Sequence, residues 1–148
     1  MEKEKAEAAT EKTGEGAISG RFSGAALAYL GDAVFETAVR AHLVRRGIAD
    51  SGKLNRLALE FVRAGKQSEA VDRLLPHLTP NEEALFKRGR NTVSGAHPKS
   101  ASAVEYRRAT GLESLFGGLY LAGELARLDE LFALAFPETV VEGNGEER

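Results

Sequence analysis

A single carboxylate interrupts an apolar stretch near the start of the chain. Asp32 follows Gly31 within residues 30–34, LGDAV, whose other members are apolar. Glycine inside a helix costs about 1 kcal/mol relative to alanine, so it conflicts with the helix that its neighbours favour. Such a local conflict is typical of a functional position. The alternative is that Asp32 lies on the solvent face with Glu36 and Arg40, in ordinary ion pairs one helical turn apart.

A second carboxylate, Glu113, occupies a comparable position in a later helical segment. Tyr106, Thr110, Glu113 and Gly117 follow one another at three- and four-residue steps, so they share one helical stripe. Mg²⁺ takes one or two carboxylates and keeps several water molecules. Two carboxylates from different helices beside a basic surface would meet that requirement. Asp32 and Glu113 together are therefore a candidate magnesium site.

Charge is unevenly distributed along the chain. The formal net charge is −2, yet residues 21–136 carry 16 basic and 13 acidic side chains, and the acidic excess lies in the two ends. Residues 84–113 hold six basic side chains against Glu105 and Glu113. The six are Lys87, Arg88, Arg90, Lys99, Arg107 and Arg108. Such a basic window is either a solvated face or a surface that attracts nucleic acid.

The composition excludes several kinds of chemistry. The 148 residues contain no cysteine, which removes disulfides, thiolate nucleophiles and cysteine-bound metal sites. His42, His77 and His97 are too widely spaced for a histidine motif, so any metal should be held by oxygen. The chain has no apolar run of transmembrane length, and its polar amino terminus is unlike a signal peptide. We therefore expect a cytoplasmic protein that has no membrane partner.

Helical periodicity dominates the chain from Ser23 onward. Ser23 is a capping residue for a first helix that is predicted to end near Arg46, where Gly47 stops it. The predicted apolar face of this helix consists of Ala26, Leu27, Leu30, Val34, Ala38, Ala41 and Val44. A long amphipathic helix at this point would carry Asp32 in its middle.

The rest of the chain is also predicted to be helical. Further helices are expected over residues 51–64, 66–75, 80–88, 102–122 and 125–136. Thr79-Pro80-Asn81-Glu82 is a capping box with proline at the first helical position. Residues 89–99 are predicted to form a loop rich in hydrogen-bond donors. We therefore expect one all-α domain over residues 23–136, flanked by polar tails at residues 1–22 and 137–148 without fixed structure.

Several short motifs surround the two carboxylates in sequence. They are LAYLGDAVFE at residues 27–36, RGRN at 88–91, SG at 94–95, PK at 98–99, YR at 106–107 and TGLESLFG at 110–117. In this order they resemble the catalytic domain of the ribonuclease III family over about residues 23–136. The resemblance is to the short bacterial subfamily, Mini-ribonuclease III, which lacks a separate double-stranded-RNA-binding domain. It implies an all-α endonuclease domain that pairs as a two-fold homodimer.

Matched residue by residue, the resemblance implies that Asp32 and Glu113 are the catalytic residues and the Mg²⁺ ligands. Two nearby positions depart from full-length ribonuclease III: Ala28 stands in place of a glutamate and Thr110 in place of an aspartate. The short subfamily is similar at both positions, which favours it over an inactive relative. With fewer carboxylates, the number of bound ions stays open.

The resemblance implies magnesium-dependent hydrolysis of double-stranded RNA, leaving 5′-phosphate and 3′-hydroxyl ends. A-form RNA is recognised mainly through its shape and backbone. The candidate RNA-binding residues are therefore Arg88, Arg90, Asn91, Lys99 and Arg107. Arg108 is turned about 100° around the helix from Arg107 and is a poorer candidate. The subfamily implies the precursor of large-subunit (23S) ribosomal RNA as substrate, and DNA is not expected as a partner.

Two other functions stay open at this point. A catalytically inactive RNA-binding or ribosome-assembly module is one, although the presence of both Asp32 and Glu113 argues against it. A helical dimer that serves as a protein-interaction scaffold is the other, but it leaves the donor-rich loop without a purpose. Gly117, Gly118, Leu119 and the apolar positions of the first helix could form the dimer contact or belong to the core of one chain.

Overall fold

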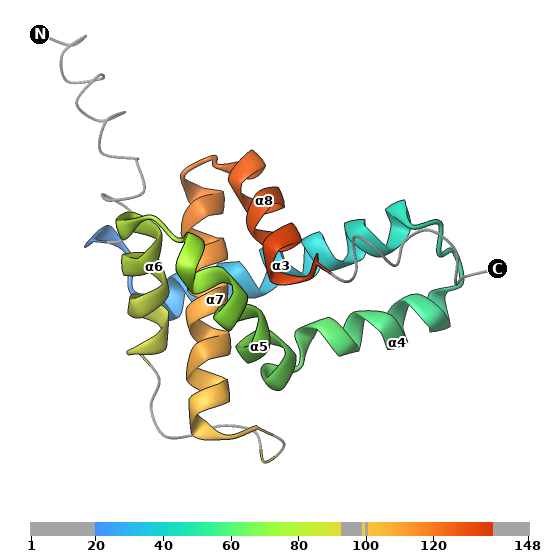
Figure 1. Cartoon of the computed structure of the whole chain (residues 1–148), viewed down its shortest axis with the longest axis horizontal. Coiled ribbons are helices and arrows are strands. Elements are labelled where there is room, and N and C mark those ends of the chain that lie inside the picture. Colours follow the sequence, from blue (N-terminus) through green and yellow to red (C-terminus); the bar gives the residue numbers. More distant parts are fainter. Residues whose placement is uncertain (1–19, 93–98, 100, 138–148) are drawn as a thin grey trace, which may run out of the picture.

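The computed structural model describes residues 20–92, 99 and 101–137, and within these residues it is helical, without a strand (Figure 1). Its elements are α3 (Gly24–Arg45), α4 (Ser51–Val62), α5 (Ala64–Leu74), the 3₁₀ turn η1 (Leu75–His77), α6 (Pro80–Arg90), α7 (Ala103–Leu121) and α8 (Leu125–Ala135). The predicted all-α fold is confirmed. Apart from residues 20–22 and Pro137, both predicted tails lie outside the described residues. No helix in the described part is long and apolar enough to cross a bilayer.

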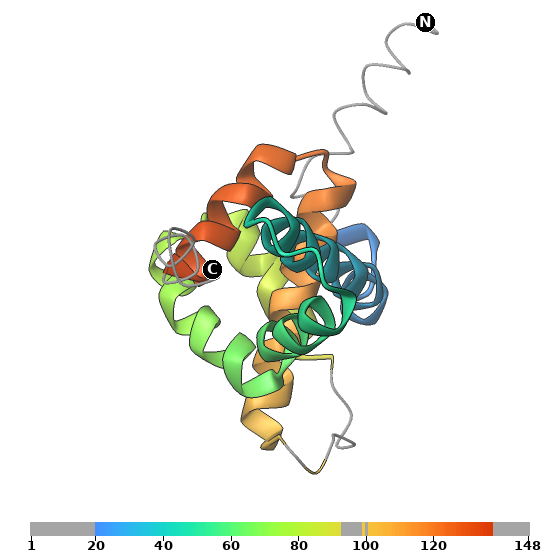
Figure 2. The same ribbon diagram turned by 90° about the vertical axis from the view of Figure 1, so that its right-hand side faces the viewer.

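Helix α7 is the centre of the fold. It packs against α3, α5, α6 and α8, and Figure 2 shows it passing between α3 and α5. Leu112, Leu115, Phe116 and Leu119 of α7 are fully buried. Phe116 meets Phe35 of α3 edge to face, with ring centroids 5.5 Å apart. Because burial of each such side chain stabilises the fold by about 1.5–3 kcal/mol, this core fixes α3 against α7.

Side-chain caps mark the helix ends that the sequence predicted. The Ser23 hydroxyl accepts a hydrogen bond from the Ala26 backbone N–H at 3.1 Å, and Gly47, with φ of 87°, follows the end of α3. Thr79 and Glu82 form the predicted capping box at the start of α6, with the Thr79 N–H donating to Glu82 at 2.9 Å. The starts of α3 and α6 are therefore encoded locally.

The buried face of α3 differs from the predicted one. It consists of Gly24, Leu27, Ala28, Gly31, Phe35, Val39 and Leu43, whereas the predicted apolar residues other than Leu27 are half-buried or exposed. The cause is a close approach of α3 and α7. A Cβ atom on Gly31 would lie 1.5 Å from the Glu113 carbonyl oxygen, and one on Gly117 would lie 2.0 Å from that of Leu27. Gly31 and Gly117 allow this close approach, while Leu27, Phe35, Val39 and Leu43 supply the large side chains of the buried face.

Helix α6 extends two residues beyond its predicted end. It ends at Arg90 rather than Arg88, so Gly89, which was predicted to lie in a loop, is buried in the last helical turn. A Cβ atom on Gly89 would lie 2.5 Å from the Thr110 carbonyl oxygen. This glycine therefore serves close packing against α7 rather than a turn. Residues 93–98 of the predicted loop lie outside the described residues.

Candidate functional site

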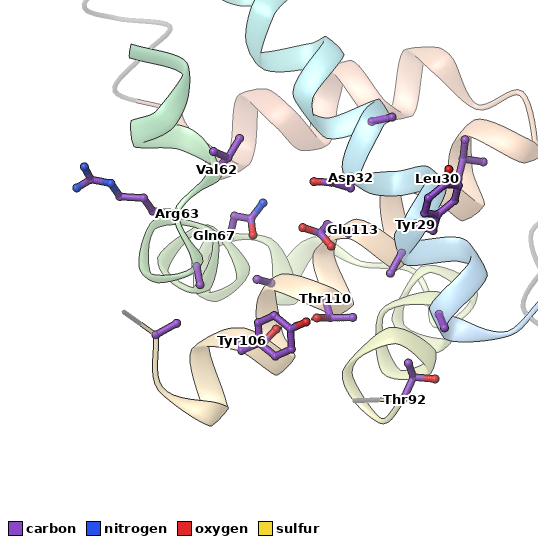
Figure 3. A pocket seen from close by; sticks show the side chains of 16 residues that line it. Tyr29, Leu30, Asp32, Val62, Arg63, Gln67, Thr92, Tyr106, Thr110 and Glu113 are labelled. Carbon is purple, nitrogen blue, oxygen red and sulfur yellow. Dashed lines mark hydrogen bonds between the residues drawn. The ribbon is translucent and has the colours of Figure 1, made fainter. Parts of the chain in front are cut away.

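Asp32 and Glu113 line one pocket of about 860 Å³. Asp32 comes from α3 and Glu113 from α7, and the junction of α4 and α5 supplies part of the wall. Figure 3 shows both carboxylates reaching into the same space. The structure thus brings together the two residues that the sequence singled out as metal ligands; we call this cavity the carboxylate pocket.

The crossing of α3 and α7 places these two side chains. Gly31 immediately precedes Asp32, and its backbone lies against the carbonyl group of Glu113. Gly117, one turn after Glu113, lies equally close to the backbone of α3. Any larger residue at either glycine would force the helices apart. The glycine that disfavours an isolated helix beside Asp32 is therefore the residue that allows the two carboxylates to meet.

The alternative interpretation, in which Asp32, Glu36 and Arg40 form ion pairs on the solvent face of α3, is correct only for Glu36 and Arg40. Glu36 and Arg40 form an ion pair on α3, with 2.9 Å between carboxylate oxygen and guanidinium nitrogen. Asp32 is exposed as well, but it lines the carboxylate pocket. The helical spacing therefore predicted the Glu36–Arg40 pair correctly, while Asp32 lies beside Glu113.

The surroundings of Glu113 disfavour its charged form. Burial, followed by the negative charge of Asp32, raises the pKa of Glu113 to about 7, and a hydrogen bond from the Gln67 side chain opposes the rise. Two carboxylates that repel one another in a partly enclosed pocket are stabilised by a divalent cation between them. The electrostatics of the pocket therefore favour cation binding.

The donor set fits a hydrated magnesium ion. Ala28 and Thr110, where the full-length enzymes carry carboxylates, line the same pocket, and the Thr110 hydroxyl donates to the Tyr106 carbonyl oxygen at 2.9 Å. Within residues 20–92, 99 and 101–137, no group of three or more His, Cys, Asp or Glu side chains is placed to hold a metal. Two carboxylates with several water molecules nevertheless match the preference of Mg²⁺.

Three of the five predicted RNA-binding residues meet in a second pocket, of about 410 Å³. Its lining residues are Arg90, Asn91, Val104, Arg107 and Arg108, and we call it the basic pocket. Arg90 Nε donates to Asn91 Oδ1 at 3.1 Å. Thr92, the next residue after Asn91, lines the carboxylate pocket, so the two pockets are neighbours. An extended anionic chain could therefore contact both.

The remaining basic residues are placed differently. The Arg88 guanidinium donates to the Phe22 carbonyl oxygen through two nitrogens, at 3.2 and 3.0 Å. It thereby holds the segment that leads into α3. Lys99 lies in an exposed turn whose neighbours at 93–98 and 100 are outside the described residues. Arg108 forms an ion pair with Asp72 of α5 although it also lines the basic pocket.

The carboxylate pocket contains two polar residues that the sequence analysis missed. Arg63 lies at the junction of α4 and α5, and Gln67 lies in the first turns of α5. Gln67 is only 2% exposed. A signal for it was present, because Gln67 precedes Ala70 and Val71 by three and four residues and so shares their buried face. A polar side chain on an apolar helix face is unusual enough to mark a candidate.

Comparisons with known proteins agree with this fold. Residues 25–124 match the family model described as the Ribonuclease III domain. The Mini-ribonuclease 3 of Desulfitobacterium hafniense is 47% identical over 102 residues, covering 69% of this chain and 64% of that protein. The Mini-ribonuclease 3 of Symbiobacterium thermophilum is 45% identical over 109 residues, covering 74% of this chain and 84% of that protein. The crystal structure of protein FN1578 from Fusobacterium nucleatum matches with a TM-score of 0.71 and 27% identity, covering 80% of this chain and 94% of that one.

The described helices therefore have the fold of a ribonuclease III domain. This chain belongs to the ribonuclease III family, and the relatives that it matches at 40–47% identity are named Mini-ribonuclease 3. The family that the motifs predicted is confirmed. The match to the Desulfitobacterium protein spans a little under two thirds of that protein's length.

Proposed function

We propose that this protein is an endoribonuclease that cuts double-stranded RNA with a magnesium ion held by Asp32 and Glu113. The observation that carries the proposal is the meeting of these two carboxylates, from α3 and α7, in one pocket that adjoins the basic pocket. The relatives named Mini-ribonuclease 3 support RNA as the substrate. We extend this to the precursor of 23S ribosomal RNA, on the resemblance to the short bacterial subfamily.

Hydrolysis of a phosphodiester bond requires an activated water molecule and neutralisation of charge at the phosphate. A magnesium ion bound by Asp32 and Glu113 would supply both. The described residues that line the carboxylate pocket include no histidine, so we assign activation of the water molecule to the ion held by Asp32 and Glu113. Attack of water on phosphorus, with release of the 3′ oxygen, leaves 5′-phosphate and 3′-hydroxyl ends.

The basic pocket would hold the RNA backbone next to the reacting phosphate. Arg90 and Arg107 offer charge-assisted hydrogen bonds to phosphate oxygens, and the Asn91 amide can bond to a phosphate or a 2′-hydroxyl. Lys99, in an exposed turn, is a further candidate for a phosphate contact. Arg88 would act indirectly, by holding the segment that leads into α3, because its guanidinium is hydrogen-bonded to the carbonyl oxygen of Phe22.

A homodimer is part of the proposal, and an apolar groove on the molecule supports it. The groove, of about 740 Å³, lies over α3, the end of α7 and α8, and Leu30 and Ala33 of α3 line both it and the carboxylate pocket. Tyr120 and Leu125 in the groove are exposed large apolar residues. A second copy seated here would bring two carboxylate pockets onto neighbouring surfaces, one for each RNA strand.

The glycine-containing stretch at the end of α7 is not part of that groove. A Cβ atom on Gly117 would meet the backbone of Leu27, and one on Gly118 would meet the Leu85 side chain at 2.5 Å. Leu119 has no exposed surface. Of the two alternatives for Gly117, Gly118 and Leu119, the structure therefore favours the core of one chain.

The test compares two variants that act on different pockets. Asp32→Asn should cut magnesium-dependent cleavage of a labelled RNA duplex by orders of magnitude while leaving duplex affinity in chelator unchanged, because it removes a ligand charge without changing volume. Arg90→Ala should instead weaken duplex affinity by about 1 kcal/mol, roughly fivefold, through loss of a phosphate contact. Arg40→Ala, which alters an exposed ion pair on α3, is the control for both measurements.

Two results would count against the proposal. Full activity of Asp32→Asn would remove Asp32 from the catalytic site. A wild-type protein that binds the duplex but leaves it intact in Mg²⁺ would support the inactive RNA-binding module instead.

A further inference from the structure

Gln67 is a buried polar residue whose partner belongs to the candidate metal site. Among the buried polar residues of the described part, Ser114 donates to the Leu85 carbonyl oxygen at 2.7 Å, and Glu82 is held by Arg127 and its own helix cap. These are structural partners. The Gln67 side chain instead lines the carboxylate pocket, where Figure 3 shows it facing Glu113 and Asp32 from α5, and its presence opposes the rise in the pKa of Glu113.

Packing alone does not account for an amide at this position. Gln67 shares the buried face of α5 with Ala70, Val71 and Leu74, where a leucine or methionine would fill the same space. Burial of an unpaired amide costs about 1–3 kcal/mol, and a hydrogen bond to Glu113 would offset this cost without making the amide better than an apolar side chain. The amide group of Gln67 is therefore best explained by an interaction with the Glu113 carboxylate.

We propose that Gln67 is a positioning residue, whose side-chain amide N–H donates to the Glu113 carboxylate and fixes it in the orientation that faces Asp32. This inference rests on the proposed function, because it assigns a task to Gln67 only if Glu113 binds the metal. Nothing in the motifs around residues 27–36 or 110–117 includes Gln67.

Orientation matters more here than in a site with many carboxylates. Ala28 and Thr110 contribute no carboxylate to the pocket, so among the described residues only Asp32 and Glu113 offer the ion negative charge. Glu113 has several rotatable bonds, and a fixed hydrogen bond removes their freedom before the ion arrives. An amide does this without a positive charge, whereas a lysine or arginine at the same place would compete with the cation.

The experiment measures Mn²⁺ binding to the RNA-free, full-length protein by the loss of the free-ion signal in electron paramagnetic resonance. Gln67→Leu and Gln67→Met remove the donor at nearly constant volume, so thermal unfolding should stay within a few degrees of wild type. Mn²⁺ affinity should fall about 10- to 100-fold, the usual effect of losing a group that orients a metal ligand. The Mg²⁺ concentration for half-maximal cleavage should rise by a similar factor, with a smaller change in rate at saturating Mg²⁺.

Ser68→Ala is the matched control, because Ser68 is the adjacent buried polar residue of α5 and lines no part of the carboxylate pocket. It should bind Mn²⁺ as wild type does. Asp32→Asn and Glu113→Gln test the metal site itself, separately from the positioning role of Gln67. If both lose Mn²⁺ binding while a folded Gln67 variant keeps wild-type affinity, Gln67 has no positioning role. If both bind Mn²⁺ as wild type does, the metal site itself is wrong.

Discussion

Asp32 and Glu113 are both carboxylic acids, but their surroundings make them chemically different. Asp32 is exposed on α3, whereas Glu113 lies deeper on α7, and burial together with the charge of Asp32 raises the pKa of Glu113 to about 7. Without a cation, Glu113 is therefore partly protonated at neutral pH. A divalent cation favours the ionised form, so metal binding at this pocket should release a proton and strengthen as the pH rises.

The same shift predicts how the metal-free protein responds to pH. Glu113 titrates near 4.5 in the unfolded chain and near 7 in the folded one, so between these values the folded state binds more protons. Its contribution to the free energy of unfolding is therefore largest below pH 4.5 and falls as the pH rises to about 7. Glu113→Gln is neutral throughout and lacks this contribution. Urea unfolding of both proteins in chelator, at several pH values, isolates the difference.

The stability of wild type relative to Glu113→Gln should decrease between pH 4.5 and 7 and then level off. Because the pocket is partly open to water, the decrease should be no more than about 3 kcal/mol. If the free energies of unfolding of the two proteins change with pH in the same way, the pKa of Glu113 is not raised in the folded state.

At the scale of helices, local signals predicted the starts of α3 and α6, whereas tertiary contacts decided which face of α3 is buried. Ser23 and the Thr79–Glu82 box are readable from the sequence because a cap involves residues three apart. The face of α3 is not, because it depends on where α7 crosses, and the crossing falls at Gly31 and Gly117. Four residues of the predicted apolar face are half-buried and line the groove instead: Leu30, Val34, Ala38 and Ala41.

The candidate site divides in the same way. The motifs identified Asp32 and Glu113 because each is a carboxylate within an apolar helical stretch. Arg90 and Arg107 were identified because they belong to a window rich in basic side chains. Gln67 carries no charge and belongs to no motif. Its role depends on a contact between α5 and α7, which no pattern within α5 can supply.

The α3–α7 crossing gives a prediction at Gly31. Gly31→Ala places a methyl group 1.5 Å from the Glu113 carbonyl oxygen, and the backbone there cannot move away cheaply. Alanine improves helix propensity by about 1 kcal/mol, but overpacking of this severity should cost more, about 3 kcal/mol or above. We therefore expect a lower midpoint of thermal unfolding. Separation of the carboxylates should also weaken magnesium-dependent cleavage.

Gly52→Ala provides the control, because an added Cβ atom in α4 would approach only the Asp50 side chain, at 3.3 Å. Its unfolding midpoint should equal or slightly exceed that of wild type, because alanine favours the helix without a backbone clash. Equal midpoints for Gly31→Ala and wild type would mean that α3 and α7 are not in close contact at this glycine.

For the whole molecule, the apolar groove and the carboxylate pocket lie next to one another on α3. Leu30 and Ala33 line both cavities, so whatever covers the groove also borders the carboxylate pocket. Pairing two copies through the groove would double the basic surface and supply one pocket for each strand.

The dimer can be tested at two exposed leucines. Leu125, on α8, is 56% exposed and lines the groove, whereas Leu59, on α4, is 58% exposed and lies outside it. We expect wild type to sediment as a dimer at micromolar concentration. Leu125→Glu should raise the dimer dissociation constant at least tenfold, because it buries an unpaired charge in an apolar contact. Leu59→Glu introduces the same charge at the same exposure and should remain dimeric. A wild-type protein that sediments as a monomer at this concentration, or equal dissociation constants for the two variants, would exclude the groove as the dimer interface.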